Sequence, residues 1–236
     1  MVDIHSHILH GIADSPADIM ISLEIARQYE ESGFTHVVST PHFNPVKDNI
    51  EKFISDCEEK YAALNKLISD KGICLTLIPG AEVILCSDLL NIKDIDKLSI
   101  GSSKYLLVEF PWNAFPVSAR SILYSLELQG FIPILAHPEK NYEIRAQIDR
   151  FIDLTETGLL IQIDAESLVK DKRSKKAADI FFRKNVVSFI ATDVHRPGEC
   201  FINFENAIKA AGRKYGSENI RKLLNNSSII INNGSV

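Results

Sequence analysis

Histidine and carboxylate residues recur in short clusters along this chain, and the first cluster lies near its beginning. Asp3-Ile4-His5-Ser6-His7 places two imidazoles two residues apart beside an aspartate. Similar clusters follow at Thr40-Pro41-His42, Gly80-Ala81-Glu82, Val108-Glu109, Ala136-His137-Pro138 and Thr192-Asp193-Val194-His195. Imidazole and carboxylate ligands without thiolate suit divalent ions such as Mn, Zn, Fe or Mg. The clusters therefore indicate a metallohydrolase that binds more than one ion.

Spacing within two of the clusters favours metal binding over a structural role. In an extended segment, residues two apart point to the same face of the strand. His5 and His7 have this spacing, and Asp193 and His195 repeat it. Each pair is therefore predicted to contribute two ligands to an ion.

The remaining candidates are single residues, for which structural roles stay open. Glu82 and Glu109 each follow an apolar run, where an unpaired carboxylate is costly to bury. A metal ion would offset that cost, and so would a salt bridge to lysine or arginine. His137 and His42 also follow apolar runs, whereas Asp14 fits a turn or helix cap as well as it fits a ligand.

Most of the clusters end a near-continuous apolar run, the pattern of buried parallel strands. Seven strands are predicted, over residues 2–4, 36–40, 74–79, 105–110, 132–136, 159–164 and 186–192. Helices are predicted over residues 15–32, 48–71, 117–129, 144–156, 174–184, 203–215 and 217–225. This alternation predicts one α/β domain over residues 1–236, an irregular (β/α)7-type, TIM-like barrel. Because barrel enzymes build their sites at the carboxyl ends of strands, the clusters are expected to meet.

Composition excludes several classes of protein. The 236 residues are 45% hydrophobic with a net charge of −5, which disfavours nucleic acid as a partner. The basic run at residues 170–176 is short and fits a solvated loop and helix start. With no signal peptide ahead of Asp3, four separated cysteines predict reduced thiols and a cytoplasmic location. No apolar stretch approaches the ~18 residues that cross a bilayer, so membrane insertion is not expected.

In their order along the chain, the motifs resemble those of the polymerase and histidinol phosphatase (PHP) family. The series is D-I-H-S-H, G-I-x-D, T-P-H, G-x-E, a strand ending in E-F, A-H-P-E and T-D-V-H. More narrowly, the chain resembles the manganese-dependent protein-tyrosine phosphatases of bacterial capsular and exopolysaccharide gene clusters. The similarity runs from Asp3 through the C-terminal helices. It implies the PHP fold and three bound ions, with Mn²⁺ first and Fe, Zn or Mg as alternatives.

The resemblance also implies which residues bind each ion. The first ion would be held by His5, His7, Glu82 and Asp193. Glu82 would bridge to the second ion, which Glu109 and His137 complete. The third ion would be held by Asp14, His42 and His195.

Two positions depart from the family pattern where phosphate is expected to bind. The family usually has arginine after H-P-E and about five residues past the last ligand histidine. This chain has Lys140 and, in an ungapped count, Cys200. Lysine attracts a phosphate without the bidentate fork of arginine. Lys140 and Arg196 are the candidates for phosphate binding, with solvent exposure as the alternative for Arg196, and Ala13 replaces an aspartate of the usual G-I-D-D.

The implied reaction is hydrolysis of phosphotyrosine in a protein, which is expected to be a membrane-associated tyrosine autokinase. A metal-bound hydroxide would attack the phosphoryl group in line. A cysteine-based mechanism needs arginine six residues after the cysteine, and none of the four cysteines has one. Phe43, Trp112 and Phe115 are candidates for flanking the mouth of the site, with packing in the core or loops as the alternative.

Other functions remain open at this point. The chain also fits a phosphatase for a small metabolite such as histidinol phosphate, or a nuclease-like phosphodiesterase. The missing arginines suggest a third function, that of a metal-binding regulator with weakened catalysis. Formation of an oligomer is open as well.

Overall fold

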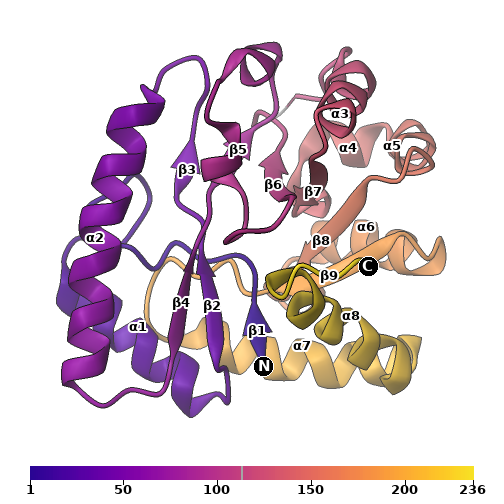
Figure 1. Ribbon diagram of the computed structural model, residues 1–236. Coiled ribbons are helices and arrows are strands. Elements are labelled where there is room, and N and C mark those ends of the chain that lie inside the picture. Colours follow the sequence, from indigo (N-terminus) through magenta and orange to yellow (C-terminus); the bar gives the residue numbers. More distant parts are fainter. Residues whose placement is uncertain (113) are drawn as a thin grey trace.

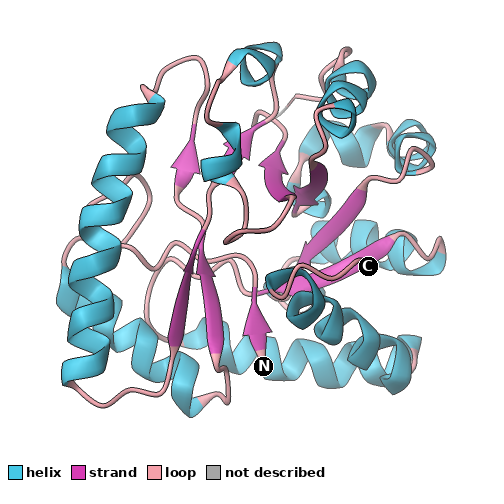
Figure 2. Ribbon diagram, in the orientation of Figure 1, coloured by secondary structure: helices cyan, strands magenta, loops and turns pink. Residues whose placement is uncertain are grey.

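Short parallel strands alternate with helices along the chain, as the apolar runs predict (Figure 1). The computed structural model describes residues 1–112 and 114–236, except for the side chains of residues 199, 200 and 202. Cys200, one of the departures from the family pattern, therefore lies outside the described side chains. In the described part, helices surround the strands on the outside (Figure 2).

The elements have the following bounds. The strands are β1 (Val2–Asp3), β2 (His36–Ser39), β3 (His42–Phe43), β4 (Thr76–Pro79), β5 (Glu82–Ile84), β6 (Tyr105–Glu109), β7 (Ile132–Ala136), β8 (Leu160–Asp164) and β9 (Val187–Ala191). The α-helices are α1 (Ile19–Glu31), α2 (Ile50–Asp70), α3 (Ala119–Leu128), α4 (Tyr142–Ala146), α5 (Ile148–Thr155), α6 (Lys172–Arg183), α7 (Glu199–Tyr215) and α8 (Ser217–Ile231). Short 3-10 helices are η1 (Ser87–Asn91), η2 (Ile95–Leu98), η3 (Pro138–Lys140) and η4 (Glu166–Leu168).

Two strand positions are interrupted, and the interruptions position the site. β2 pairs with β4, and beyond the breaks at Pro41 and Gly80 their continuations β3 and β5 pair in parallel again. Proline has no N–H for the ladder, and a Cβ at Gly80 would lie 2.9 Å from the Val38 side chain. Register in the second pair sets His42 directly beside Glu82. The seven predicted strand positions are therefore confirmed, with β3 and β5 as continuations that the sequence prediction lacked.

The strands follow one another round an irregular ring. One sheet has the order β1-β2-β4 and the other β3-β5-β6-β7-β8-β9, all in parallel. A bridge from Ser6 to Val194 joins the segment after β1 to the end of β9, and the His7 N–H donates to the Val194 carbonyl at 2.8 Å. On the other side, the Thr40 N–H donates to the Ser6 carbonyl at 2.7 Å. The expected irregular barrel is confirmed, and the first histidine cluster lies where its two sheets meet.

Some helix boundaries differ from the prediction. Asp18 caps α1 by accepting two N–H groups of its first turn, so this helix begins later than the predicted residue 15. The helix expected over 144–156 is two helices, α4 and α5, because Gln147 between them has φ −125° and ψ 45°. α8 continues past its predicted end at residue 225.

Large aromatic side chains fill the interior around the strands. Tyr29, Phe43, Phe151, Phe181 and Phe189 are fully buried. Burial of a side chain such as phenylalanine stabilises the fold by about 1.5–3 kcal/mol. Phe43 directly follows His42 on β3, so its burial anchors a strand that carries a predicted ligand.

Two expectations from composition can be compared with the described residues. None of the helices described has the length and apolar character that crossing a bilayer requires. Cys57, Cys74 and Cys86 are free thiols, in agreement with the reduced state expected for them.

Candidate metal centre

Four side chains from three distant segments form a buried quartet: His5, His7, Glu82 and Asp193. His5 Nε2 lies 3.1 Å from Glu82 Oε2 and 3.3 Å from Asp193 Oδ1. His7 Nε2 lies 3.2 Å and 3.3 Å from the same two oxygens, and the two Nε2 atoms are 3.3 Å apart. His5, His7 and Glu82 each place a ligand atom within 4.8 Å of the other two, and so do His5, His137 and Asp193. The quartet therefore offers the imidazole and carboxylate donors that divalent ions bind.

Both carboxylate oxygens of Glu82 and Oδ1 of Asp193 are buried without a hydrogen-bond partner other than the histidines that face them. Burying a carboxylate destabilises the fold by roughly several kcal/mol unless a cation or a hydrogen-bond donor compensates its charge. The donor set thus has the composition of a metal site and leaves unsatisfied the atoms that would bind the metal.

The charges of the quartet also favour a cation at its centre. Burial opposes protonation of His5, but Glu82 and Asp193 raise its pKa to about 10. For Glu82, burial is outweighed by the positive charges of His5 and His137, which hold the pKa of the carboxyl well below its usual value. Without a metal, protons on the histidines balance the carboxylates. A metal ion can replace those protons.

Gln162 fixes the ring of His5 in the orientation that metal binding needs. Its Oε1 lies 2.9 Å from His5 Nδ1, so an Nδ1–H donates to it and leaves Nε2 facing the quartet. Gln162 is fully buried on β8. The sequence prediction did not include it, because glutamine is rarely a ligand and nothing local marks it.

Two further predicted ligands approach the quartet at Glu82. His137 Nε2 lies 2.9 Å from Glu82 Oε1, while His42 Nδ1 lies 3.2 Å from Glu82 Oε2. His42 Nδ1 is also 3.0 Å from Glu109 Oε1. Glu82 therefore stands between two groups of ligand atoms, as a bridging carboxylate would.

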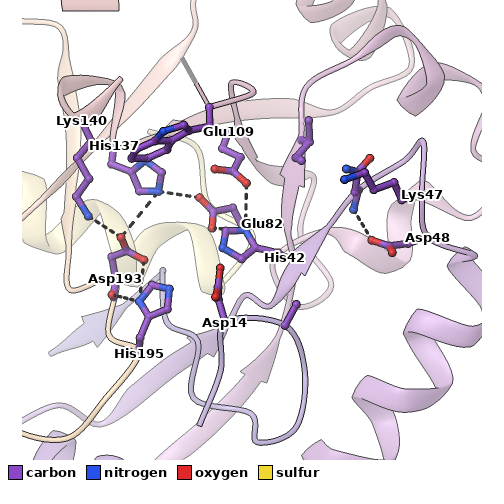
Figure 3. A pocket seen from close by; sticks show the side chains of 14 residues that line it. Asp14, His42, Lys47, Asp48, Glu82, Glu109, His137, Lys140, Asp193 and His195 are labelled. Carbon is purple, nitrogen blue, oxygen red and sulfur yellow. Dashed lines mark hydrogen bonds and ion pairs between the residues drawn. The ribbon is translucent and has the colours of Figure 1, made fainter. Parts of the chain in front are cut away.

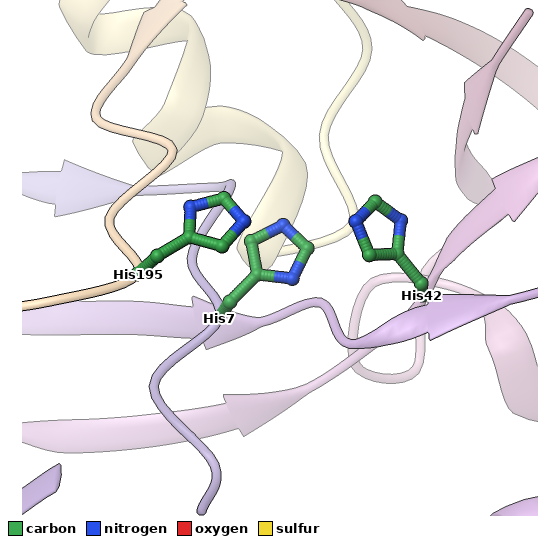
Figure 4. A group of neighbouring side chains, drawn as sticks. All are labelled: His7, His42 and His195. Atoms are coloured by element: carbon green, nitrogen blue, oxygen red, sulfur yellow. The ribbon is translucent and has the colours of Figure 1, made fainter. Parts of the chain in front are cut away.

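His7, His42 and His195 lie side by side and form a third group whose ligand atoms are within 4.8 Å of one another (Figure 4). The rings of His7 and His195 are stacked with their centroids 4.0 Å apart. Burial and the neighbouring His7 lower the pKa of His195 to about 4. His195 is therefore neutral near pH 7, the state in which imidazole binds a metal.

Above the quartet lies an open cavity of about 680 Å³. Seven of the nine predicted ligands line it, namely Asp14, His42, Glu82, Glu109, His137, Asp193 and His195. His5 and His7 lie beneath, completely buried. Figure 3 shows the histidines and carboxylates facing one another, with Asp14 at one edge and Lys47 and Asp48 to the side.

Backbone conformation marks the same residues. Five described residues other than glycine have a positive φ, and all are of the types most often found there, asparagine, aspartate or histidine. Three of them, Asp14 (φ 56°), His137 (φ 30°) and Asp193 (φ 51°), are predicted ligands. A left-handed residue of this kind costs about 1–2 kcal/mol. Such strain at three positions of one cavity is typical of a functional site.

Asp14 is the predicted ligand that the geometry supports least. It lines the cavity, but its side chain is exposed and it belongs to none of the four groups of described ligand atoms that lie close together. Its role as a ligand of a third ion stays a prediction.

Lys140 has a different position from the one expected of a phosphate clamp. Its ammonium contacts Asp164 and lies 2.7 Å from Asp193 Oδ2. Burial opposes its charge, but Asp193 and Asp164 raise its pKa and so favour the protonated form. Lys140 thus holds one oxygen of Asp193 while the other faces His5 and His7. Asp164 was missed by sequence reasoning, although it ends a predicted strand as the ligand carboxylates do.

Of the other residues predicted to contact the substrate, one lines the cavity and three do not. Arg196 is exposed and is not among the residues that line the cavity. Phe43 is fully buried and Phe115 packs against the hydrophobic core, so the expectation that they flank the mouth is wrong. Trp112 lines the cavity and is 76% exposed. It is the aromatic residue of the three that a substrate can reach.

Asp3 belongs to the first cluster but has a structural role. Its Oδ2 accepts hydrogen bonds from Tyr29 at 2.6 Å and from the Thr192 hydroxyl at 2.5 Å. Its Oδ1 accepts the Thr192 N–H at 3.2 Å. Asp3 thereby fastens β1 to the end of β9, next to the predicted ligands on both segments.

Comparisons with known proteins agree with this geometry. A family model described as capsular polysaccharide synthesis, CpsB/CapC, matches residues 1–232. Tyrosine-protein phosphatase YwqE of Bacillus subtilis is 31% identical over 242 residues, which cover 100% of this chain and 93% of that protein. Putative tyrosine-protein phosphatase CapC of Staphylococcus aureus is 34% identical over 201 residues, 83% of this chain and 77% of that protein.

Solved structures show the same relationship. A crystal structure from work on YwqE of Bacillus subtilis and CpsB of Streptococcus pneumoniae, described as unique metal-dependent tyrosine phosphatases, superposes with a TM-score of 0.92. The two sequences are 30% identical, and the superposition covers 100% of this chain and 96% of the chain in that structure. A phosphotriesterase homology protein of Escherichia coli, with phosphate in its active site, has a TM-score of 0.56 at 11% identity and 98% coverage of both chains. That second likeness shows a shared fold alone.

Proposed function

This chain belongs to the capsular polysaccharide synthesis family CpsB/CapC, and we propose that it is a metal-dependent tyrosine-protein phosphatase. The observation that carries the proposal is the buried quartet, whose unsatisfied oxygens lie beneath an open cavity. A family relationship alone would leave open whether this chain kept the metal site. The ligand geometry supports that it did.

We propose further that three ions bind, with Mn²⁺ as the natural metal and Fe, Zn or Mg as substitutes. The quartet is proposed for the first ion. Glu82, Glu109 and His137 are proposed for the second, and Asp14, His42 and His195 for the third. Among the described ligand atoms, those of Glu82 and Glu109 group with His42, and those of His42 and His195 group with His7. Ligands of this type accept several divalent ions, so availability decides among them.

Bound divalent ions supply a nucleophile near neutral pH and neutralise charge on the phosphoryl group. The chain's own residues orient these ions and the substrate. Lys140 carries a positive charge at the wall of the cavity, where it would attract phosphate while it holds Asp193. Arg196 remains the second proposed phosphate contact, although it would have to turn toward the cavity to reach a phosphate there.

Trp112 supplies the aromatic surface that a phosphotyrosine ring would need. Its exposed indole lines the cavity beside His137 and Glu109. Aromatic pairs contribute about 0.5–1.5 kcal/mol beyond the area they bury. The proposed substrate is a phosphotyrosine protein, and we propose a membrane-associated tyrosine autokinase of capsule or exopolysaccharide synthesis, reached from the cytoplasm.

One set of assays tests the function. Protein treated with a chelator is reloaded with Mn²⁺ and given a phosphotyrosine peptide, histidinol phosphate and bis-p-nitrophenyl phosphate in parallel. We expect hydrolysis of the peptide to require the metal and to exceed that of the other two substrates. Full activity without metal would exclude the proposal, as would a preference for the phosphodiester or for histidinol phosphate.

A variant tests the alternative function, that of a metal-binding regulator with weakened catalysis. The engagement of Lys140 by two carboxylates is the observation that favours this alternative. High activity of the unaltered protein rules it out. If activity is low and Lys140→Arg restores it at least tenfold, the missing arginine has weakened catalysis and the regulator is supported.

A further inference from the structure

A second cavity, of about 510 Å³, lies between α4, α5 and α6, and all charged side chains that line it are basic. Arg145, Arg173 and Lys176 supply the charge. Tyr142, Ile148 and Ile180 are among the residues that give it an apolar part. Because the whole chain has a net charge of −5, this basic groove is a local reversal of charge.

The basic groove adjoins the turn that carries Lys140. α4 begins two residues after Lys140, and α6 contacts η3. Arg145 connects the two cavities, since its Nη1 donates to the carbonyl oxygens of Glu139 at 3.1 Å and Lys140 at 2.6 Å. A ligand in the basic groove would therefore lie beside the wall of the catalytic cavity. Figure 1 shows α4, α5 and α6 on the same side of the molecule.

We infer that the basic groove binds an acidic segment of the phosphoprotein substrate, near its phosphotyrosine. The inference rests on the proposed function. Two exposed cations on one helix, Arg173 and Lys176, can pair with carboxylates of an extended segment, and arginine does so with a bidentate fork. The apolar residues of the groove would contact the side chains between those carboxylates.

Other anionic partners match the basic groove less well. Nucleic acid needs a wide basic surface, which a chain of net charge −5 with three cations in one cavity does not supply. A membrane surface requires clustered basic residues together with apolar side chains that project from the surface, whereas Ile148 and Ile180 are partly covered. A peptide fits a cavity of this size and mixed character.

The variant Arg173→Glu/Lys176→Glu tests the inference, with Lys175→Glu as the matched control. Lys175 is exposed on the same helix and does not line the groove. Two phosphotyrosine peptides serve as substrates, one with aspartate and glutamate near the phosphotyrosine and one with serine in their place. Hydrolysis of p-nitrophenyl phosphate reports on the catalytic cavity alone.

For the double variant we expect KM for the acidic peptide to rise about tenfold at unchanged kcat. Activity on the serine peptide and on p-nitrophenyl phosphate should stay within twofold, and the control should behave as the unaltered protein. Added salt should reduce the preference of the unaltered protein for the acidic peptide, because exposed charges are screened. Equal KM values for both peptides would overturn the inference.

Binding separates this inference from the proposed function. Fluorescence anisotropy of a labelled, non-phosphorylated acidic peptide should show weaker binding to the double variant than to the control, whether or not the protein hydrolyses phosphotyrosine. No difference between them overturns the inference. Binding to phosphatidylserine vesicles that the same variant abolishes, without peptide binding, would assign the groove to a membrane and overturn it as well.

Discussion

The floor and the rim of the catalytic cavity are built in different ways. The floor is the quartet of His5, His7, Glu82 and Asp193, which is almost completely buried and held at the ends of strands. The rim includes Lys47 and Trp112, both exposed and both in connecting segments. Burial makes the floor intolerant of change, because each unpaired charge there is costly. The rim can vary at low cost, so it is where specificity for a substrate can evolve.

The largest effect should come from the floor. Asp193→Asn removes the charge that faces both histidines and also the partner of Lys140. We expect kcat/KM with Mn²⁺ to fall about a thousandfold, together with loss of bound metal measured by mass spectrometry. Asp179→Asn is the control, since Asp179 pairs with Arg183 and neither residue lines the cavity. A loss of less than tenfold would show that the floor is not the metal site.

Metal binding to the floor should depend strongly on pH. Burial opposes protonation of His42, but Glu109 and Glu82 raise its pKa to about 8, and that of His5 is about 10. Their folded pKa values exceed the unfolded 6.5, so their protons stabilise the metal-free protein below pH 6.5. This stabilisation is lost as pH rises through 8 and then 10.

Because metal must displace these protons, we expect the apparent affinity for Mn²⁺ to rise about a hundredfold from pH 6 to pH 8. Titration calorimetry measures the affinity, and thermal melts in chelator should show falling stability over the same range. His42→Gln should make both dependences shallower. An affinity that does not change with pH would contradict the assignment of these histidines.

A smaller effect on metal binding is expected from Asp164, which does not belong to the floor but contacts Lys140. Asp164→Asn removes a negative partner of Lys140, which in turn holds Asp193. Changes to residues that orient metal ligands typically cost 10–100-fold, and we expect about tenfold in Mn²⁺ affinity. Lys140→Arg, which keeps the positive charge, should retain most of the affinity. Unchanged affinity in Asp164→Asn would show that Lys140 holds Asp193 without help.

The smallest effect belongs to the rim. Trp112→Ala should raise KM for a phosphotyrosine peptide about threefold, with kcat and metal content unchanged. Tyr124→Ala is the matched control, because Tyr124 is 60% exposed and does not line the cavity. If kcat or metal content falls instead, Trp112 belongs with the floor and the comparison between the two regions breaks down.

Sequence reasoning predicted the fold because its signals are local. Apolar runs and helix-ending glycines report on neighbouring residues, and they predicted all seven strand positions. Boundaries without such a signal were missed. The split between α4 and α5 at Gln147 has neither glycine nor proline to mark it, and β5 is too short to be recognised from three residues.

For the site, the sequence by itself determined which residue types are present and that they end successive strands. His5, His7, Glu82 and Asp193 could be named for that reason. Only the tertiary structure decided their partners. It turned Lys140 toward a carboxylate 53 residues away and set Gln162 behind a histidine 157 residues away. Such pairs depend on how distant strands align, and no local pattern of polarity encodes that alignment.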